Sequence, residues 1–157
     1  MDEQLRAELL RRMEKDQQAR LTDDLESGAF EAVDAENLPW LKELIHSRGW
    51  PGASLVGSDG AHAAWMLVQH ADADPKFQRH CLVLLRAAVL AGEASLVDQA
   101  FLTDRVLVHE RKPQEYGTQM TRRGGKWAPF EPPEIGEWLT ITCTGCGREM
   151  RIIGSQT

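Results

Sequence analysis

One apolar stretch, residues 82–91, most constrains how this 157-residue chain can fold, because only Arg86 interrupts it. In a helix its apolar side chains would cover most faces, and a helix of that kind is normally buried on nearly all sides. Asp74 and Pro75 supply an N-cap and a first-turn proline upstream, and Gly92 supplies a stop. The stretch therefore predicts a helix at the centre of a helical domain.

Four more segments repeat apolar residues at helical spacing around that stretch. Asn37 and Asp59 are candidate N-caps of the second and third helices. Ser95 followed by Asp98 matches a capping box at the start of the fifth. The expected helices cover residues 2–27, 37–49, 59–70, 75–92 and 96–109.

The pattern changes after Pro113, where short segments flank a Gly-rich turn at residues 122–125 and predict a β-hairpin. Residues 138–153 alternate like two further short strands around Cys-Thr-Gly-Cys-Gly. We therefore expect a mostly α fold, an irregular bundle of about five helices with a small C-terminal β-hairpin region. In domain terms, residues 1–130 would form one helical domain with a polar pocket, and residues 131–157 a short divergent tail.

The composition predicts a soluble globular protein, with 42% hydrophobic residues, 27% charged residues and a net charge of −6. An acidic balance argues against a nucleic-acid partner, which would require clustered Lys and Arg. The charged N-terminal segment does not resemble a secretory signal, and no apolar run is long enough to span a membrane. Three cysteines are too few for a disulfide framework, so we expect a cytoplasmic protein without a membrane partner. The oligomeric state stays open.

Polar side chains concentrate in two islands on segments that otherwise predict buried helix or strand. Such groups are buried only when each finds a partner, so their concentration indicates a pocket. Residues 62–80 form the first island and residues 104–119 the second, and we expect them to be two walls of one pocket. Its candidate residues are His62, Gln69, His70, Gln78, Asp104, Arg105, Tyr116, Thr118 and Gln119.

Histidine is the natural general base at neutral pH, so we assign His70 that catalytic role. Asp104 would orient the imidazole or bind a cation, and Arg105 would clamp an anionic group. His62, Gln69, Gln78, Tyr116, Thr118 and Gln119 would bind the substrate. The alternative for each is structural: a histidine satisfied within the core, or Asp104 and Arg105 as an ion pair. His80 is interpreted as structural.

The same residues resemble a bacterial domain-of-unknown-function family over roughly residues 5–130. Members share G-W-P, V-G-x-x-G, Q-H-A-D, F-Q, D-R and Y-G-T-Q elements. In this sequence those elements are Gly49-Trp50-Pro51, Val56-Gly57 with Gly60, Gln69–Asp72, Phe77-Gln78, Asp104-Arg105 and Tyr116–Gln119. The resemblance ends after Phe130, and it implies a shared pocket without an activity.

Cys143 and Cys146 have the spacing of a zinc knuckle, in which the glycine between them lets both thiolates face one ion. Two cysteines are half of a structural zinc site. A divalent metal such as zinc is therefore one candidate cofactor, and a dithiol without a role or a redox pair are the alternatives.

From these residues we expect a protein that binds a polar or anionic small molecule, or processes it by acid/base or metal-assisted hydrolysis. The alternative is a non-catalytic binding or interaction module of the adaptor or immunity type. A module predicts polar groups that pair internally and an exposed apolar surface.

Overall fold

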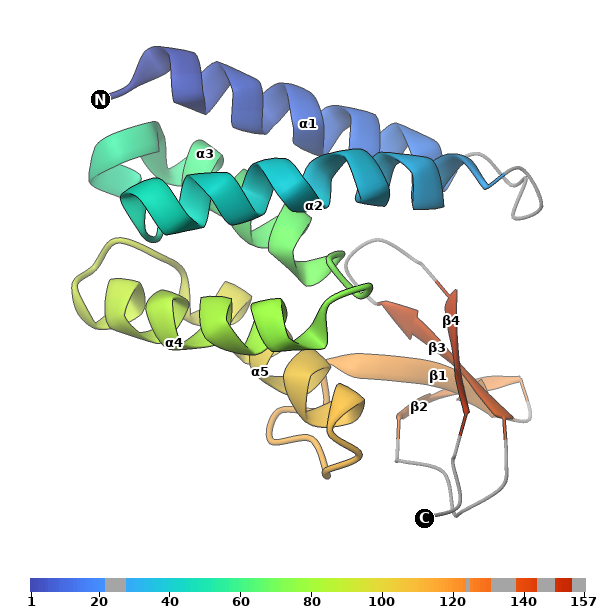
Figure 1. Cartoon of the computed structure of the whole chain (residues 1–157). Helices are drawn as coiled ribbons and strands as arrows, with labels where there is room; N and C mark the ends of the chain where they lie inside the picture. Colours follow the sequence, from blue (N-terminus) through green and yellow to red (C-terminus); the bar gives the residue numbers. More distant parts are fainter. Residues whose placement is uncertain (22–27, 124, 131–137, 144–148, 154–157) are drawn as a thin grey trace. The chain divides into compact units, whose positions relative to one another are not determined.

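The structure, a computed structural model, describes residues 1–21, 28–123, 125–130, 138–143 and 149–153. The fold is mostly α-helical with a small C-terminal sheet, as the sequence predicts (Figure 1). The residues group into two compact units, Met1–Leu102 and Thr103–Thr157, with the boundary inside the fifth helix. The division at residue 130 stays a prediction.

The elements are α1 (Glu3–Leu21), α2 (Ala29–Arg48), α3 (Ala53–Gln69), α4 (Pro75–Leu90), α5 (Leu96–His109), β1 (Gln119–Arg123), β2 (Lys126–Pro129), β3 (Trp138–Cys143) and β4 (Glu149–Ile153).

Helix α3 forms the centre of the first unit, with α1 and α2 side by side against it (Figure 1). Ten of its residues are buried, and four of these are Gly60, Ala61, Ala63 and Ala64. Small side chains let a neighbouring helix approach closely. A Cβ at Gly60 would lie 3.4 Å from Cγ of Arg6 on α1. The same Cβ would lie 2.9 Å from Cβ of Val56 in α3, so a side chain at residue 60 would require Val56 to shift.

The prediction that residues 82–91 form the central helix is wrong. In α4 only one stripe is buried, including Cys81, Leu82 and Leu85. Val83 is 62% exposed and Leu90 is 91% exposed. A helix can be apolar on most faces and still pack along a single stripe, so the composition of α4 does not decide its burial.

The expected starts of two helices are also wrong. Helix α2 begins at Ala29, so Asn37 is no cap; it is buried inside the helix, where its Oδ1 accepts a hydrogen bond from Nη1 of Arg12 at 2.9 Å. Helix α3 begins at Ala53 and breaks at Gly57, whose φ of 75° and ψ of 162° are not helical. Asp59, the other expected cap, instead pairs with Arg6 on α1.

The other two expected caps are confirmed. Oδ1 of Asp74 accepts the backbone N–H of Phe77 at 3.0 Å at the start of α4. Oγ of Ser95 accepts the backbone N–H of Val97 at 3.1 Å and that of Asp98 at 3.4 Å at the start of α5. Both caps satisfy donors that the first helical turn leaves without partners.

The second unit holds an antiparallel sheet in the order β2-β1-β3-β4. The expected hairpin is confirmed, since β1 pairs with β2 and Arg123 stands opposite Lys126. The two short strands expected within residues 138–153 are confirmed as the pair β3–β4. Phe130, which follows β2, is buried, and its N–H donates to the carbonyl oxygen of Gln119 at 2.8 Å.

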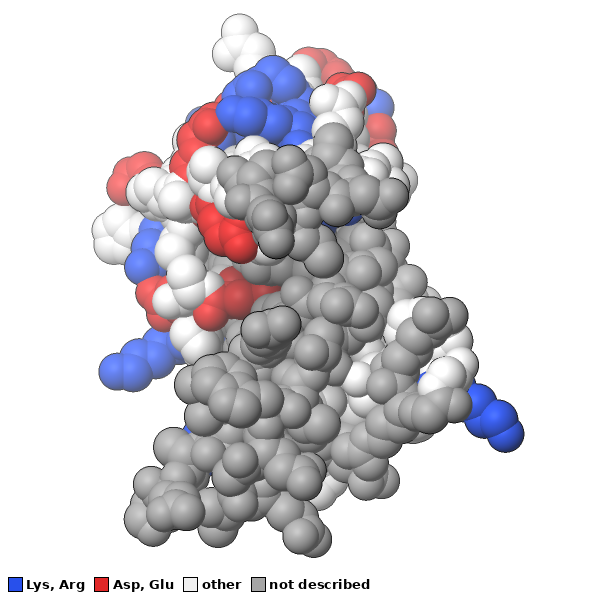
Figure 2. Space-filling view, turned by 90° about the vertical axis from the view of Figure 1, so that its right-hand side faces the viewer, with Lys and Arg blue, Asp and Glu red and all other residues white. Residues whose placement is uncertain are grey.

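Charged side chains of both signs are interspersed over the helices at the top of the face in Figure 2. On α1, Arg11 pairs with Glu8 at 2.7 Å, and Lys15 pairs with Glu36 of α2 at 2.5 Å. Interspersed charge of this kind is typical of a solvated helix face. Among the described helices, none has both the length and the apolar character needed to cross a bilayer.

Candidate functional site

His62 of α3 faces Asp98 of α5 and forms a partly exposed histidine–carboxylate pair with it. Nδ1 of His62 lies 3.2 Å from each carboxylate oxygen of Asp98. The imidazole is 46% exposed, whereas the Asp98 side chain is 8% exposed. Because a carboxylate only accepts hydrogen bonds, Nδ1 carries the proton, and Nε2 is left as the atom that can exchange a proton with a ligand.

A cavity of about 290 Å³ opens beside this pair and has both residues in its wall. The loop between α4 and α5 supplies one side, including Glu93 and Ser95, and α3 supplies the other, including Ser58. Glu93 also fixes the start of α3, because its Oε2 accepts the backbone N–H of Ser54 at 2.7 Å. The cavity therefore combines the His62–Asp98 pair with two hydroxyl groups, that of Ser58 on α3 and that of Ser95 on the loop.

Asp98 raises the pKa of His62 above its ordinary value of 6.5. The hydrogen bond from Nδ1 is the main cause, and the negative charge of Asp98 adds to it, while partial burial of the ring acts in the opposite direction. The ring also lies 4.9 Å from the ring of Trp65, which in turn contacts Phe101 edge-on at 6.0 Å. These ring contacts pack one side of the imidazole against the aromatic side chains of the first unit.

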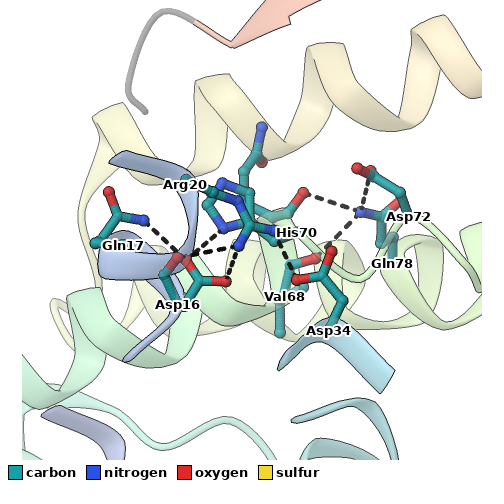
Figure 3. Close-up of polar contacts among 9 residues, drawn as sticks. Asp16, Gln17, Arg20, Asp34, Val68, His70, Asp72 and Gln78 are labelled. Atoms are coloured by element: carbon teal, nitrogen blue, oxygen red, sulfur yellow. Dashed lines mark hydrogen bonds and ion pairs between the residues drawn. The ribbon is translucent and has the colours of Figure 1, made fainter. Parts of the chain in front are cut away.

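His70, the base assigned from the sequence, lies in a buried network with residues of α1 (Figure 3). Its Nδ1 lies 2.8 Å from Oδ2 of Asp16, and each side chain is 1% exposed. Asp16 also accepts hydrogen bonds from Nη1 of Arg20 at 2.6 Å and from Gln17 at 2.8 Å. The carboxylate that orients His70 is therefore Asp16.

Arg20 extends this network to α2, since its Nη2 donates to Oδ1 of Asp34 at 2.6 Å. The pKa of Asp16 is lowered although burial alone would raise it, because the hydrogen bond from His70 and the charges of His70 and Arg20 outweigh burial. These contacts of Asp16, Arg20, Asp34 and His70 join α1, α2 and the end of α3.

Gln69 and Gln78 are both fully buried and serve the turn between α3 and α4. Nε2 of Gln78 donates to the carbonyl oxygens of Val68 and Gln69 at 3.1 and 3.2 Å, and to Oδ1 of Asp72 at 3.2 Å (Figure 3). These carbonyls belong to the last turn of α3, which leaves them without helical donors. The observed contacts of Gln78 are therefore those of a helix C-cap.

In the second unit, Asp104 is fully buried and organises the loop before β1. Its oxygens accept the backbone N–H groups of Glu115, Tyr116 and Thr118 at 2.8, 3.1 and 2.8 Å, and the hydroxyl of Thr118 at 2.9 Å. These hydrogen bonds satisfy the buried carboxylate. Its four acceptor contacts all go to the loop.

The remaining candidates of the second island differ in exposure. Arg105 and Gln119 are fully buried, whereas Tyr116 is 55% exposed. The backbone N–H of Gln119 donates to Oε1 of Gln114 at 2.7 Å, and its Nε2 donates to the Thr118 hydroxyl at 3.1 Å. The two islands belong to different units, so the single pocket that they would share stays a prediction, as do the catalytic roles of Asp104 and Arg105.

Metal ligation also stays a prediction. Within the described residues, no three or more His, Cys, Asp or Glu side chains are grouped to hold an ion. Cys146 and the side chain of Cys143 lie outside the described residues, and only the backbone of Cys143 is placed, at the end of β3. Cys81 is a buried free thiol in α4.

Sequence reasoning did not select four of the residues that the structure brings to the histidines: Asp16, Arg20, Asp34 and Asp98. A signal for Asp16 exists, because it continues the stripe of Leu5, Leu9 and Met13 at helical spacing. A charge on such a stripe predicts a buried carboxylate with a partner. Asp98 gave no such signal, since it fits a capping box equally well.

Residues 4–125 match the model of a family of unknown function (DUF6624), and the chain belongs to that family. The match confirms membership in a domain-of-unknown-function family. No curated protein and no solved structure matches the chain. The family itself has no described activity, so function must be argued from the site.

Proposed function

We propose that this protein binds a polar small molecule in the cavity beside His62 and acts on it by acid/base catalysis, with hydrolysis as the reaction. The observation that carries the proposal is the Asp98–His62 pair in the cavity wall. A carboxylate that holds the protonated Nδ1 leaves Nε2 basic and oriented. This moves the role of base from His70 to His62.

His62 would remove a proton from water as the water attacks the substrate, and would then return that proton to the leaving group. Asp98 would stabilise the imidazolium formed between these steps. Ser58 and Ser95 offer hydroxyl groups to polar atoms of the substrate. The described wall carries the carboxylates Glu93 and Asp98 and no lysine or arginine, which favours a neutral polar substrate over an anionic one.

The proposal is tested by hydrolysis of small chromogenic esters and amides, beginning with 4-nitrophenyl acetate. His62→Gln removes the proton acceptor and should lower the rate by about 10²-fold or more. His109→Gln is the matched control, since it replaces a histidine outside the cavity. Equal rates for His62→Gln and the parent protein would refute the assignment.

A second function, an interaction module, is favoured by a different observation. Large apolar side chains of α4 and the start of α5 face solvent: Val83 is 62%, Leu90 91%, Leu96 70% and Val97 63% exposed. Exposed apolar groups of this size are often used in association. Concentration-dependent sedimentation that Leu90→Lys abolishes, with no hydrolysis by the parent protein, would favour this function.

A further inference from the structure

Four basic side chains surround a second cavity of the first unit, which has a volume of about 390 Å³. Lys42 and His46 come from α2, and Lys76 and His80 come from the first two turns of α4. His46, Lys76 and His80 are exposed. The first turn of α4 adds the positive end of a helix dipole to the same place. The cavity therefore has the electrostatics of an anion site.

One carboxylate, Asp74, also lines this cavity, but its charge is already matched. Oδ2 of Asp74 lies 2.6 Å from Nζ of Lys42, and Oδ1 accepts the N–H of Phe77. The pKa of Asp74 is lowered, mainly by the hydrogen bond from Lys42. Among the described residues, no ion pair or hydrogen bond engages the side chains of His46, Lys76 or His80. A net positive charge is left for a ligand.

The rest of the lining is apolar. Ile45 is 5% exposed and Phe77 is 9% exposed, and both lie in the cavity wall. Nζ of Lys42 lies 6.0 Å from the centre of the Phe77 ring. An anion that also carries a flat apolar group could therefore use the basic rim and the apolar wall together.

We propose that this cavity binds a small organic phosphomonoester. The phosphate would lie among Lys76, His46 and His80, and the apolar part would pack against Ile45 and Phe77. A phosphomonoester suits the site because its oxygens can accept hydrogen bonds from several cations at once. The proposal uses none of the residues of the His62 cavity and stands independently of the function proposed there.

The test is a titration of the isotope-labelled full chain with phenyl phosphate, followed by NMR. Amide resonances of residues 42–46 and 74–80 should shift and saturate. Phenol, which lacks the charge, should not bind, and inorganic phosphate, which lacks the ring, should bind more weakly. No saturable shift with phenyl phosphate, or equal affinity for phenol, would overturn the proposal.

Two lysine variants distinguish binding in this cavity from general electrostatic attraction of the ligand to the protein. Lys76→Ala should weaken phenyl phosphate binding about three- to fivefold, as expected for one exposed ionic contact. Lys112→Ala removes an exposed lysine outside the cavity and should leave the affinity unchanged. Equal weakening in both variants would mean that only the net charge of the protein attracts the ligand, and would also overturn the proposal.

Discussion

Asp16 and His70 lie 54 positions apart in the sequence, yet Oδ2 of Asp16 is 2.8 Å from Nδ1 of His70 in the interior of the first unit. Arg20 completes the pair by bonding both Asp16 and Asp34. A buried charge is tolerated only with close partners, so this cluster fixes how α1, α2 and the end of α3 meet.

Removal of the Asp16 carboxylate should therefore strongly destabilise the protein. Asp16→Ala leaves Arg20 and His70 buried without their shared acceptor, at a cost of about 3–5 kcal/mol in the free energy of unfolding. Urea denaturation measures this cost. Glu14→Ala, at an exposed acid of the same helix, should change stability by less than about 0.5 kcal/mol. If Asp16→Ala and Glu14→Ala lowered the free energy of unfolding by similar amounts, the buried cluster would not be a source of stability.

Because of the Asp16 carboxylate, the free energy of unfolding should depend on pH in the acid range. The pKa of Asp16 is lowered in the folded protein from its ordinary value of 3.8. Its contribution to stability is therefore fully present above pH 3.8 and is lost as the pH falls through the lowered folded value. Urea denaturation at successive pH values should show a steeper acid loss for the parent protein than for Asp16→Asn. Parallel curves would contradict this role.

Asp104 should stabilise the conformation of the loop at residues 115–118. Asp104→Ala removes the acceptor of three backbone N–H groups and one hydroxyl, at a cost of about 2 kcal/mol or more. Hydrogen exchange at the amides of Tyr116 and Thr118 should become faster than in the parent protein, whereas Glu115→Ala, at an exposed residue of the same loop, should leave the exchange of Thr118 unchanged. Unchanged exchange would mean that the loop holds its conformation without the carboxylate.

The Cys81 thiol should be unreactive in the folded protein. Burial in α4, with a smaller effect from the charge of Asp74, raises its pKa to about 12. Little thiolate then exists near neutral pH, and the thiolate is the reactive form. In a Cys143→Ser, Cys146→Ser background, alkylation at about pH 8 should be slow until denaturant is added. Rapid alkylation of the folded protein would contradict this environment for Cys81.

Local signals explain which elements the sequence predicted well. The caps Asp74 and Ser95 act on N–H groups within three residues, so they are readable without knowledge of the fold. The start of α2 was missed because Asn37, a good cap by type, instead accepts a hydrogen bond from Arg12 of another helix. Tertiary contacts of this kind override local preference.

The site was predictable only in part, for a similar reason. Sequence reasoning selected His62 and His70 as unusual polar groups on apolar helices. Their partners Asp98 and Asp16 lie 36 and 54 positions away, and only the packing of α3 against α5 and α1 identifies them. Burial then distinguishes the two histidines, because the ring of His70 is enclosed and that of His62 borders a cavity.

The central claim, that His62 acts as a base oriented by Asp98, is tested most directly by the dependence of 4-nitrophenyl acetate hydrolysis on pH. The rate should rise with pH through an apparent pKa above 6.5, the ordinary value, because Asp98 favours the protonated imidazole. Asp98→Asn should move that midpoint to lower pH and reduce the maximal rate. An identical profile for Asp98→Asn, or a rate that survives His62→Gln, would contradict the account.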